Sequence, residues 1–430
     1  MKLPSTRSIL YTFFTLCFIF GASFAIILYS RGYRLDLTKN SVKPTGLISA
    51  TSDPIGAQIL VDTRLRSATN NTFTIDPGWY TVQIIKEGYI GWQKKLRIQG
   101  EVVTRADAFL FPKNPSLSPL TTSGLEHPIL SPDGTKIAYT IPLDVTRDGQ
   151  SSKAGLWVLE LVDRPLGRNR DPQLLGQSNG FFNLSSASLL WSPDSSQILV
   201  LLPGAARLYS SSKPLSFDDV SLDYQALIET WTIEKQLKDG QKLAAYKQDF
   251  INVATSSAKI LSFSPDETKL LYEATAGATI PLIINPPLIG TNPTVEVRTI
   301  KHGNLYVYDS KEDKNYLVLS DTEVKQFAPS PTTKPTPKPK QPLQPIPPIQ
   351  RQQNTLSPIS WFPTNRHLIV AGDKKIDVME FDRTNWITVY SGPFVDGFVA
   401  AWTNGSRLII MTNLNPNAGT LPNLYTVNLR

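Results

Sequence analysis

The sequence predicts a mainly β protein built from an N-terminal transmembrane helix, a small β-sandwich domain and a β-propeller of five or six blades, with six favoured. Three observations predict this architecture. Residues 8–30 form one apolar run without a charge, residues 44–112 alternate short β-type runs with Gly and Pro turn signals, and from residue 113 onward one phrase recurs along the chain. The 430 residues are enough for these three parts.

Composition excludes several classes of protein. One cysteine and three histidines leave no disulfide framework and no Cys-based or His-rich metal site. The positive net charge of +7 comes from two segments, because residues 1–43 hold six basic side chains against one acid and residues 324–355 hold five basic side chains and no acid, while the rest of the chain has a net charge of −3. A basic face on a folded domain is therefore not expected, nor is nucleic acid as a partner.

The first part of the chain predicts a short tail at 1–7, a membrane anchor at 8–30 and a juxtamembrane segment at 31–43. As a helix, the uncharged run would be roughly 34 Å long, enough to cross a hydrocarbon core of about 30 Å. A cleaved signal peptide would have a shorter apolar region and end at a small-x-small site, whereas here the apolar residues continue to Tyr29, just before the charged Arg31. An uncleaved single-pass anchor is the preferred interpretation.

The orientation of the anchor follows less directly from charge. Two basic side chains precede the apolar run and four follow it, which taken alone favours a cytoplasmic C-terminal part. Long domains, however, cross the membrane largely regardless of charge. We therefore expect a cell-membrane protein whose large C-terminal part is extracytoplasmic.

Residues 44–112 predict a small β domain with strands at 46–52, 58–62, 79–86, 92–98 and 102–110. The ordered motifs at 54–57, 59–62, 77–80, 86–89 and Trp92 resemble a PEGA domain. The resemblance implies a noncatalytic, sandwich-like module found in exported or surface proteins. Two positions depart from the family pattern.

Ile55 replaces the glutamate that gives the PEGA family its name, and Thr63 stands where a glycine usually follows the aspartate. The threonine predicts a longer hairpin turn or one of another type. Trp79, Tyr89 and Trp92 would form either an aromatic platform for a sugar or peptide or part of the core, and we favour the core because a small module needs large rings.

A Ser-Pro-Asp phrase marks the region 113–430. Three clear copies lie at 130–139, 191–200 and 263–272, and weaker ones at 361–370 and 402–410; a second apolar phrase follows most of them. Each unit predicts four strands, which is typical of a β-propeller blade. The phrase resembles TolB-like and WD-type propellers, a resemblance that implies a fold and no particular function.

The units differ in length, so insertions are expected. One insertion predicts a helix at 224–237, and a poorly marked sixth blade would occupy 205–255. A strand near 115–130 is expected to complete the last unit and close the ring. Residues 324–355 hold nine prolines and no acid, and predict an extended linker that either serves as a spacer or recruits a partner.

No motif for catalysis stands out. Asp133, Asp194 and Asp266 repeat in one local context, which favours turn formation over metal binding or acid catalysis. Ser256 and Lys259 match Ser-x-x-Lys by chance. The three histidines, at 127, 302 and 367, share no pattern. The sequence therefore predicts no catalytic, cofactor-binding or metal-binding residue, and it leaves the ligand-binding residues unassigned.

These features favour a membrane-anchored binding or scaffold protein of the cell envelope, with no enzymatic activity and no cofactor. Its propeller would present a surface to a protein or glycan partner. Two alternatives remain open: a propeller hydrolase acting on envelope glycans with paired carboxylates, and a purely structural envelope protein.

Overall fold

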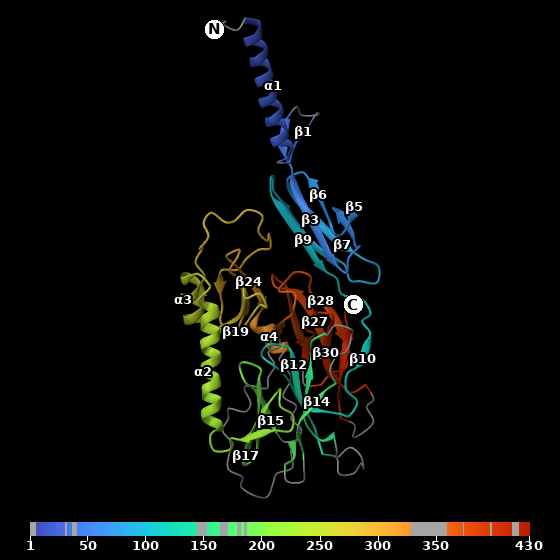
Figure 1. Cartoon of the computed structure of the whole chain (residues 1–430), viewed down its shortest axis with the longest axis vertical. Helices are drawn as coiled ribbons and strands as arrows, with labels where there is room; N and C mark the ends of the chain where they lie inside the picture. Colours follow the sequence, from blue (N-terminus) through green and yellow to red (C-terminus); the bar gives the residue numbers. More distant parts are fainter. Residues whose placement is uncertain are drawn as a thin grey trace. The chain divides into compact units, whose positions relative to one another are not determined.

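The computed structural model describes residues 6–30, 32–36, 41–143, 153–163, 171–178, 182–184, 187–327, 359–372, 374–395, 398–414 and 421–430. The chain is mainly β and divides into two compact units (Figure 1). Unit 1 contains residues 1–111 and 284–295, and unit 2 contains residues 112–283 and 296–430.

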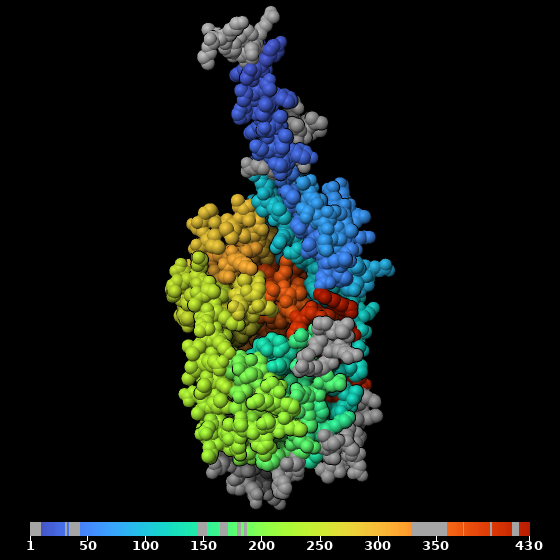
Figure 2. All heavy atoms as spheres, in the orientation of Figure 1, coloured from blue at the N-terminus to red at the C-terminus, as the bar shows by residue number. Residues whose placement is uncertain are grey.

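Unit 1 begins with the helix α1 (Thr6–Ser30). Its segment Leu10–Ser30 has a mean hydropathy of 2.1 and no buried residue, and it is long and apolar enough to cross a membrane. Figure 2 shows α1 in blue, and on this face most of the helix is not covered by other atoms of the chain. A hairpin of β1 (Tyr33–Asp36) and β2 (Ser41–Pro44) then leads to the β domain.

The β domain of unit 1 consists of two sheets around one core. The first has the order β6-β3-β9, with β3 parallel to β9, and the second has the order β5-β4-β7-β8. Their inward side chains form one buried cluster that includes Ile48, Ile59, Val82, Trp92 and Ala106. The strands are β3 (Gly46–Asp53), β4 (Gln58–Val61), β5 (Arg64–Ala68), β6 (Asn71–Ile75), β7 (Gly78–Ile85), β8 (Trp92–Ile98) and β9 (Val103–Phe109).

The expected strands of this domain are all present, and two further strands were not predicted. β5 and β6 are short and mostly exposed, so they lack the apolar alternation that marks a strand in sequence. The prediction for the turn after β4 was wrong. Asp62 and Thr63 make a two-residue turn with φ angles of 47° and 69°, so threonine takes the left-handed position that favours glycine.

The described residues of unit 2 include five four-stranded antiparallel sheets, which we number in chain order. Sheets 1 and 2 contain β11 (Glu126–Leu130), β12 (Lys136–Ile141), β13 (Gly155–Glu160), β14 (Gln173–Gln177), β15 (Ser188–Trp191), β16 (Gln197–Leu202), β17 (Ala205–Ser210) and β18 (Phe217–Asp219). Sheet 3 contains β19 (Ala258–Phe263), β20 (Lys269–Ala274), β23 (Leu305–Asp309) and β24 (Lys314–Leu319).

Sheet 4 contains β25 (Ile359–Trp361), β26 (His367–Gly372), β27 (Lys375–Glu380) and β28 (Ile387–Ser391). Sheet 5 combines β29 (Val399–Ala401), β30 (Arg407–Thr412) and β31 (Asn423–Asn428) with the early strand β10 (Leu117–Pro119). The pairing of β10 with β31 joins the two ends of unit 2, as expected from the incomplete last unit.

The favoured sixth sheet at 205–255 is not found there. β17 and β18 complete sheet 2, and the rest of the segment forms α2 (Tyr224–Leu243) and α3 (Gln248–Ser257). The predicted helix is therefore confirmed and is longer than expected. Short elements complete unit 2: β21 (Ala278–Thr279), β22 (Thr299–Ile300) and α4 (Asp321–Phe327). Residues 324–327 of the expected linker end α4, and its remainder lies outside the described residues.

Buried clusters join neighbouring elements of unit 2. Sheet 1 shares one cluster with sheet 5 and another with sheet 2, while sheets 3 and 4 share a third. The two helices pack on sheets instead: Trp231 of α2 lies against Leu199 and Ala206 of sheet 2. Phe250 of α3 stacks on Tyr308 of sheet 3 with ring centroids 3.7 Å apart. The helices thus cover sheet faces that would otherwise expose apolar side chains.

Candidate functional site

The repeated phrase forms the same turn in sheets 1, 2 and 3. In each, a serine hydroxyl donates to the aspartate two residues later, at 2.5 Å for Ser131, 2.5 Å for Ser192 and 2.7 Å for Ser264. The same serine oxygen accepts the backbone N–H at the start of the next strand. Each aspartate also accepts from the Thr or Ser that follows it by two positions.

These bonds explain the aspartate pKa values. The hydroxyl groups of Ser192 and Ser196 hold the pKa of Asp194 at about 2, because hydrogen bonds to the charged form favour it. Burial raises the pKa of Asp133 and of Asp266, but hydrogen bonds from the neighbouring hydroxyl groups outweigh it and leave both values below the ordinary one. All three aspartates therefore stabilise their own turns, as the sequence predicted, and Asp266 Oδ2 also lies 3.9 Å from the Lys311 ammonium.

A cavity of about 550 Å³ lies where turns and first strands of four sheets meet. Pro132, Pro265 and Pro363 line it from equivalent positions in the turns of sheets 1, 3 and 4, and Thr403 lines it from the same position in sheet 5. Its volume is in the range of sites for small ligands, about 300–1,000 Å³. Equivalent residues of four repeats thus surround one space.

The wall of this cavity is largely apolar, with a few polar groups. Phe263 and Trp361 contribute aromatic rings, and Ser360 contributes an exposed hydroxyl group. The charged groups are Asp133, already held within its turn, and the exposed ion pair between Lys242 Nζ and Glu267 Oε1 at 3.0 Å. Such a lining suits an apolar group flanked by hydrogen-bonding atoms.

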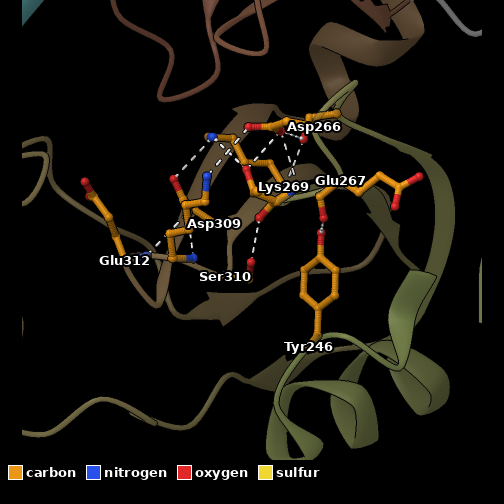
Figure 3. Close-up of polar contacts among 10 residues, drawn as sticks. Tyr246, Asp266, Glu267, Lys269, Asp309, Ser310 and Glu312 are labelled. Atoms are coloured by element: carbon orange, nitrogen blue, oxygen red, sulfur yellow. Dashed lines mark hydrogen bonds and ion pairs between the residues drawn. The ribbon is translucent and has the colours of Figure 1, made fainter. Parts of the chain in front are cut away.

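The polar cluster next to the turn of sheet 3 is structural (Figure 3). Lys269 and Asp309 are buried and lie opposite each other on β20 and β23, with Nζ and Oδ2 3.6 Å apart. Asp309 also accepts the Lys311 N–H at 2.9 Å. Lys136 in sheet 1 and His367 in sheet 4 each lie opposite an acidic residue at the corresponding register. A basic residue opposite an acidic one is therefore a repeated feature of the strand pairing in these sheets.

Tyr246 connects the helical segment to this turn. Its hydroxyl group donates to the Glu267 carbonyl oxygen at 3.0 Å, and burial raises its pKa well above the ordinary range. Figure 3 shows Tyr246 reaching up from the helical segment toward Glu267. The connection fixes the turn that carries part of the cavity wall.

The three aromatic residues of unit 1 that the sequence singled out do not form a single surface. Trp92 is 3% exposed and belongs to the core, and Tyr89 packs partly against it. Trp79, by contrast, is 52% exposed, and the Lys95 ammonium lies 5.6 Å from its ring centroid. The assignment to the core is correct for Trp92 and wrong for Trp79, whose ring lies on the outer face of β7.

The remaining candidate residues do not come together. Ser256 lies in the last turn of α3, and its hydroxyl group donates to the Asn252 carbonyl oxygen at 2.8 Å. His367 is buried beside Thr364, while His127 and His302 are exposed. Within the described residues, no group of three or more His, Cys, Asp or Glu is placed to hold a metal ion.

Sequence reasoning missed the cavity residues because they come from different repeats. Lys242, Trp361 and Ala401 are far apart in the chain, and only folding places them on one wall. The proline of the phrase was a usable signal, since a residue that recurs at one turn position faces the same side in every unit.

Comparisons with known proteins bear on both units. Residues 45–114 match the family model described as the PEGA domain, which confirms the resemblance seen in the sequence and indicates an envelope-associated protein. No curated protein matches the chain. Among solved structures, a protein of Agrobacterium tumefaciens named provisionally as TolB is similar, with 10% identity, a TM-score of 0.21, and coverage of 69% of this chain and 73% of that chain. This TM-score is too low to establish the fold.

Proposed function

We propose that this protein is a membrane-anchored, extracytoplasmic binding protein of the cell envelope. In this proposal α1 is the anchor, unit 2 is a β-propeller of five blades in which α2 and α3 occupy the gap between sheets 2 and 3, and the cavity binds a partner without catalysis. The observation that carries the proposal is the convergence of equivalent turn residues from four sheets on one cavity.

Two further observations support a closed ring. β10 pairs with β31, so the beginning of unit 2 completes the sheet formed by its end. Successive sheets also share buried clusters, from sheet 5 to sheet 1, from sheet 1 to sheet 2 and from sheet 3 to sheet 4. Radial repetition with the ends joined is how propellers protect their edge strands.

The lining favours a peptide segment of an envelope protein over a glycan. Prolines and the side chains of Phe263 and Trp361 provide apolar wall, and hydroxyl groups such as that of Ser360 can bond to a peptide backbone. Sugar recognition usually needs an open aromatic face. Trp361 is partly buried, and its indole N–H points to the Ser262 carbonyl oxygen at 3.5 Å.

The carboxylates at the cavity support binding rather than hydrolysis. A glycosidase needs one carboxylic acid with a raised pKa beside a second carboxylate. Asp133 has a lowered pKa because of its turn bonds, and Glu267 is half-exposed and paired with Lys242. Neither has the environment of a general acid.

Photo-crosslinking in intact cells tests the binding function. A photoreactive amino acid at Ser360, in the cavity wall, should form a covalent adduct whose mass identifies a peptide or a glycan. The same group at Leu222, which is 97% exposed elsewhere in unit 2, should not give that adduct. Filling the cavity with Ala401→Trp should abolish the Ser360 adduct. An adduct that persists in this variant would contradict binding in the cavity.

A further inference from the structure

Residues 284–295 form an exposed apolar segment that belongs to unit 1, although the chain inserts it between β21 and β22. Ile289 is 70% exposed, Leu288 is 47% exposed and Val295 is 86% exposed. No charged residue occurs between Glu273 and Glu296. Exposed aliphatic side chains in an uncharged stretch are typical of surfaces that meet another apolar phase.

Hydrogen bonds place this segment at one end of the β domain. The Gly290 N–H donates to Gln99 Oε1 at 2.9 Å, in the turn between β8 and β9. A Cβ on Gly290 would lie 2.7 Å from Val102 Cγ1, so the segment approaches that turn closely. Gly290 also has a φ of 76°, which suits glycine at this close approach.

The same turn lies next to the chain that leaves α1. The Glu101 N–H donates to the Thr45 carbonyl oxygen at 3.1 Å, and the Thr45 N–H donates to the Gly32 carbonyl oxygen at 2.9 Å. Gly32 in turn donates to the Tyr29 carbonyl oxygen, in the last turn of α1. The turn that holds Gly290 is thus linked to the end of the apolar helix through three successive backbone hydrogen bonds.

We propose that segment 284–295 enters the headgroup region of the bilayer and makes a second membrane contact beside α1. The inference rests on the proposed role of α1 as an anchor. If α1 spans the membrane, its end at Ser30 lies near the interface, because 25 helical residues are about 37 Å long and the hydrocarbon core is about 30 Å thick. The exposed Leu288 and Ile289 would then be available to the same interface.

The charge of the connecting segment favours an anionic lipid surface. Residues 31–43 carry four basic side chains and one acid. Basic residues next to a membrane helix are attracted to anionic headgroups, and apolar side chains then add to that attraction. Two contacts, one spanning and one interfacial, would restrict the tilt of unit 1 on the membrane.

Fluorescence quenching on the full chain tests this contact. An environment-sensitive fluorophore is attached to Ile289→Cys in a Cys17→Ser background, and the protein is placed in nanodiscs of phosphatidylcholine and phosphatidylglycerol. Lipids with a doxyl group near the headgroup should remove at least half of the emission, and the spectrum should shift to the blue. Leu222→Cys, the matched exposed position in unit 2, should show neither change. Leu288→Cys provides a second label should Ile289→Cys fail to fold.

Labelling the native Cys17 in α1 separates the two hypotheses. Because Cys17 lies near the middle of α1, its label is tested with lipids that carry the doxyl group deep in the acyl chain. If these lipids quench Cys17 while the headgroup-doxyl lipids quench neither segment label, the anchor stands and the second contact is wrong. If the deep quenchers do not reach Cys17, the anchor itself is wrong and this inference fails with it. A segment label that is shifted to the blue but is not quenched by the doxyl lipids would mean that protein covers the segment, which also overturns the proposal.

Discussion

Five equivalent turns in unit 2 use a left-handed residue at the same position. Gly134, Ser195, Glu267, Asn365 and Gly405 have φ angles between 57° and 70°. The left-handed conformation raises the conformational energy of a residue with a Cβ by roughly 1–2 kcal/mol, so the three turns without glycine are destabilised by about this amount. Side-chain and backbone hydrogen bonds within each turn offset this cost and keep the geometry constant while the sequence varies.

Thr63 is the clearest strained residue in unit 1. Replacing it by glycine should raise the free energy of opening of the β4–β5 hairpin by about 1 kcal/mol, because glycine removes the left-handed strain at φ 69°. Native-state hydrogen exchange of the hairpin amides measures this change. Thr72→Gly, at an exposed position in β6, should instead destabilise its strand. Equal effects at both positions would contradict the role of strain.

Asp194 should make unit 2 less stable in acid. Its pKa is about 2 in the folded chain and near 3.9 when unfolded, so its contribution is complete above about pH 4 and is lost as the pH falls toward 2. Asp194→Asn should reduce the drop in stability across that window. The denaturant midpoint at pH 4 and pH 2, compared with Asp239→Asn on α2, measures the effect. Identical pH slopes in both variants would count against it.

At the scale of elements, α2 and α3 form where a sixth sheet was expected, and they pack on sheets 2 and 3. The buried face of α2 carries Trp231, which is 7% exposed, and its outer face carries Ile233 and Leu237, both exposed. Trp231 is the most deeply buried ring that holds the helix against sheet 2, and Tyr224, Leu227 and Ile228 pack partly buried beside it. α3 is held by the stack of Phe250 on Tyr308.

Trp231→Ala should loosen α2. Removal of a buried tryptophan typically costs about 3–5 kcal/mol, and few other α2 side chains are buried to compensate. Hydrogen exchange of the α2 amides should become much faster while sheet 1 keeps its protection. Thr232→Ala, on the exposed side of the same helix, should change the opening free energy by less than about 0.5 kcal/mol. Unchanged exchange in Trp231→Ala would contradict the packing.

Local patterns predicted the elements that depend on neighbouring residues. The Ser-Pro-Asp turns, β8 and the start of α2 follow from short-range hydrogen bonding and periodicity, so they were visible in the sequence. β5 escaped detection because four of its five residues are exposed. The two-residue turn at Thr63 was missed because the register of β4, β5 and β7 overrides the local preference for glycine.

At the scale of the whole molecule, the cavity and the membership of segment 284–295 in unit 1 depend on contacts far apart in the chain. Gly290 and Gln99 are separated by 191 positions, and no local signal connects them. The apolar helix α1 was visible in the sequence because its length and composition are properties of one continuous segment. The cavity was not visible in the sequence, because its wall is assembled from four repeats.

The proposed function requires unit 2 to lie outside the cytoplasm. Trypsin treatment of intact cells, with a cytoplasmic protein as the lysis control, is the most direct test. The segment from Lys334 to Arg351 contains the basic residues Lys338 and Lys340 among many prolines, and mass spectrometry can map cleavage at Arg351 and at Lys340. We predict cleavage there while the cytoplasmic control stays intact. Protection in whole cells that is lost on lysis would contradict the extracytoplasmic orientation and the binding function that depends on it.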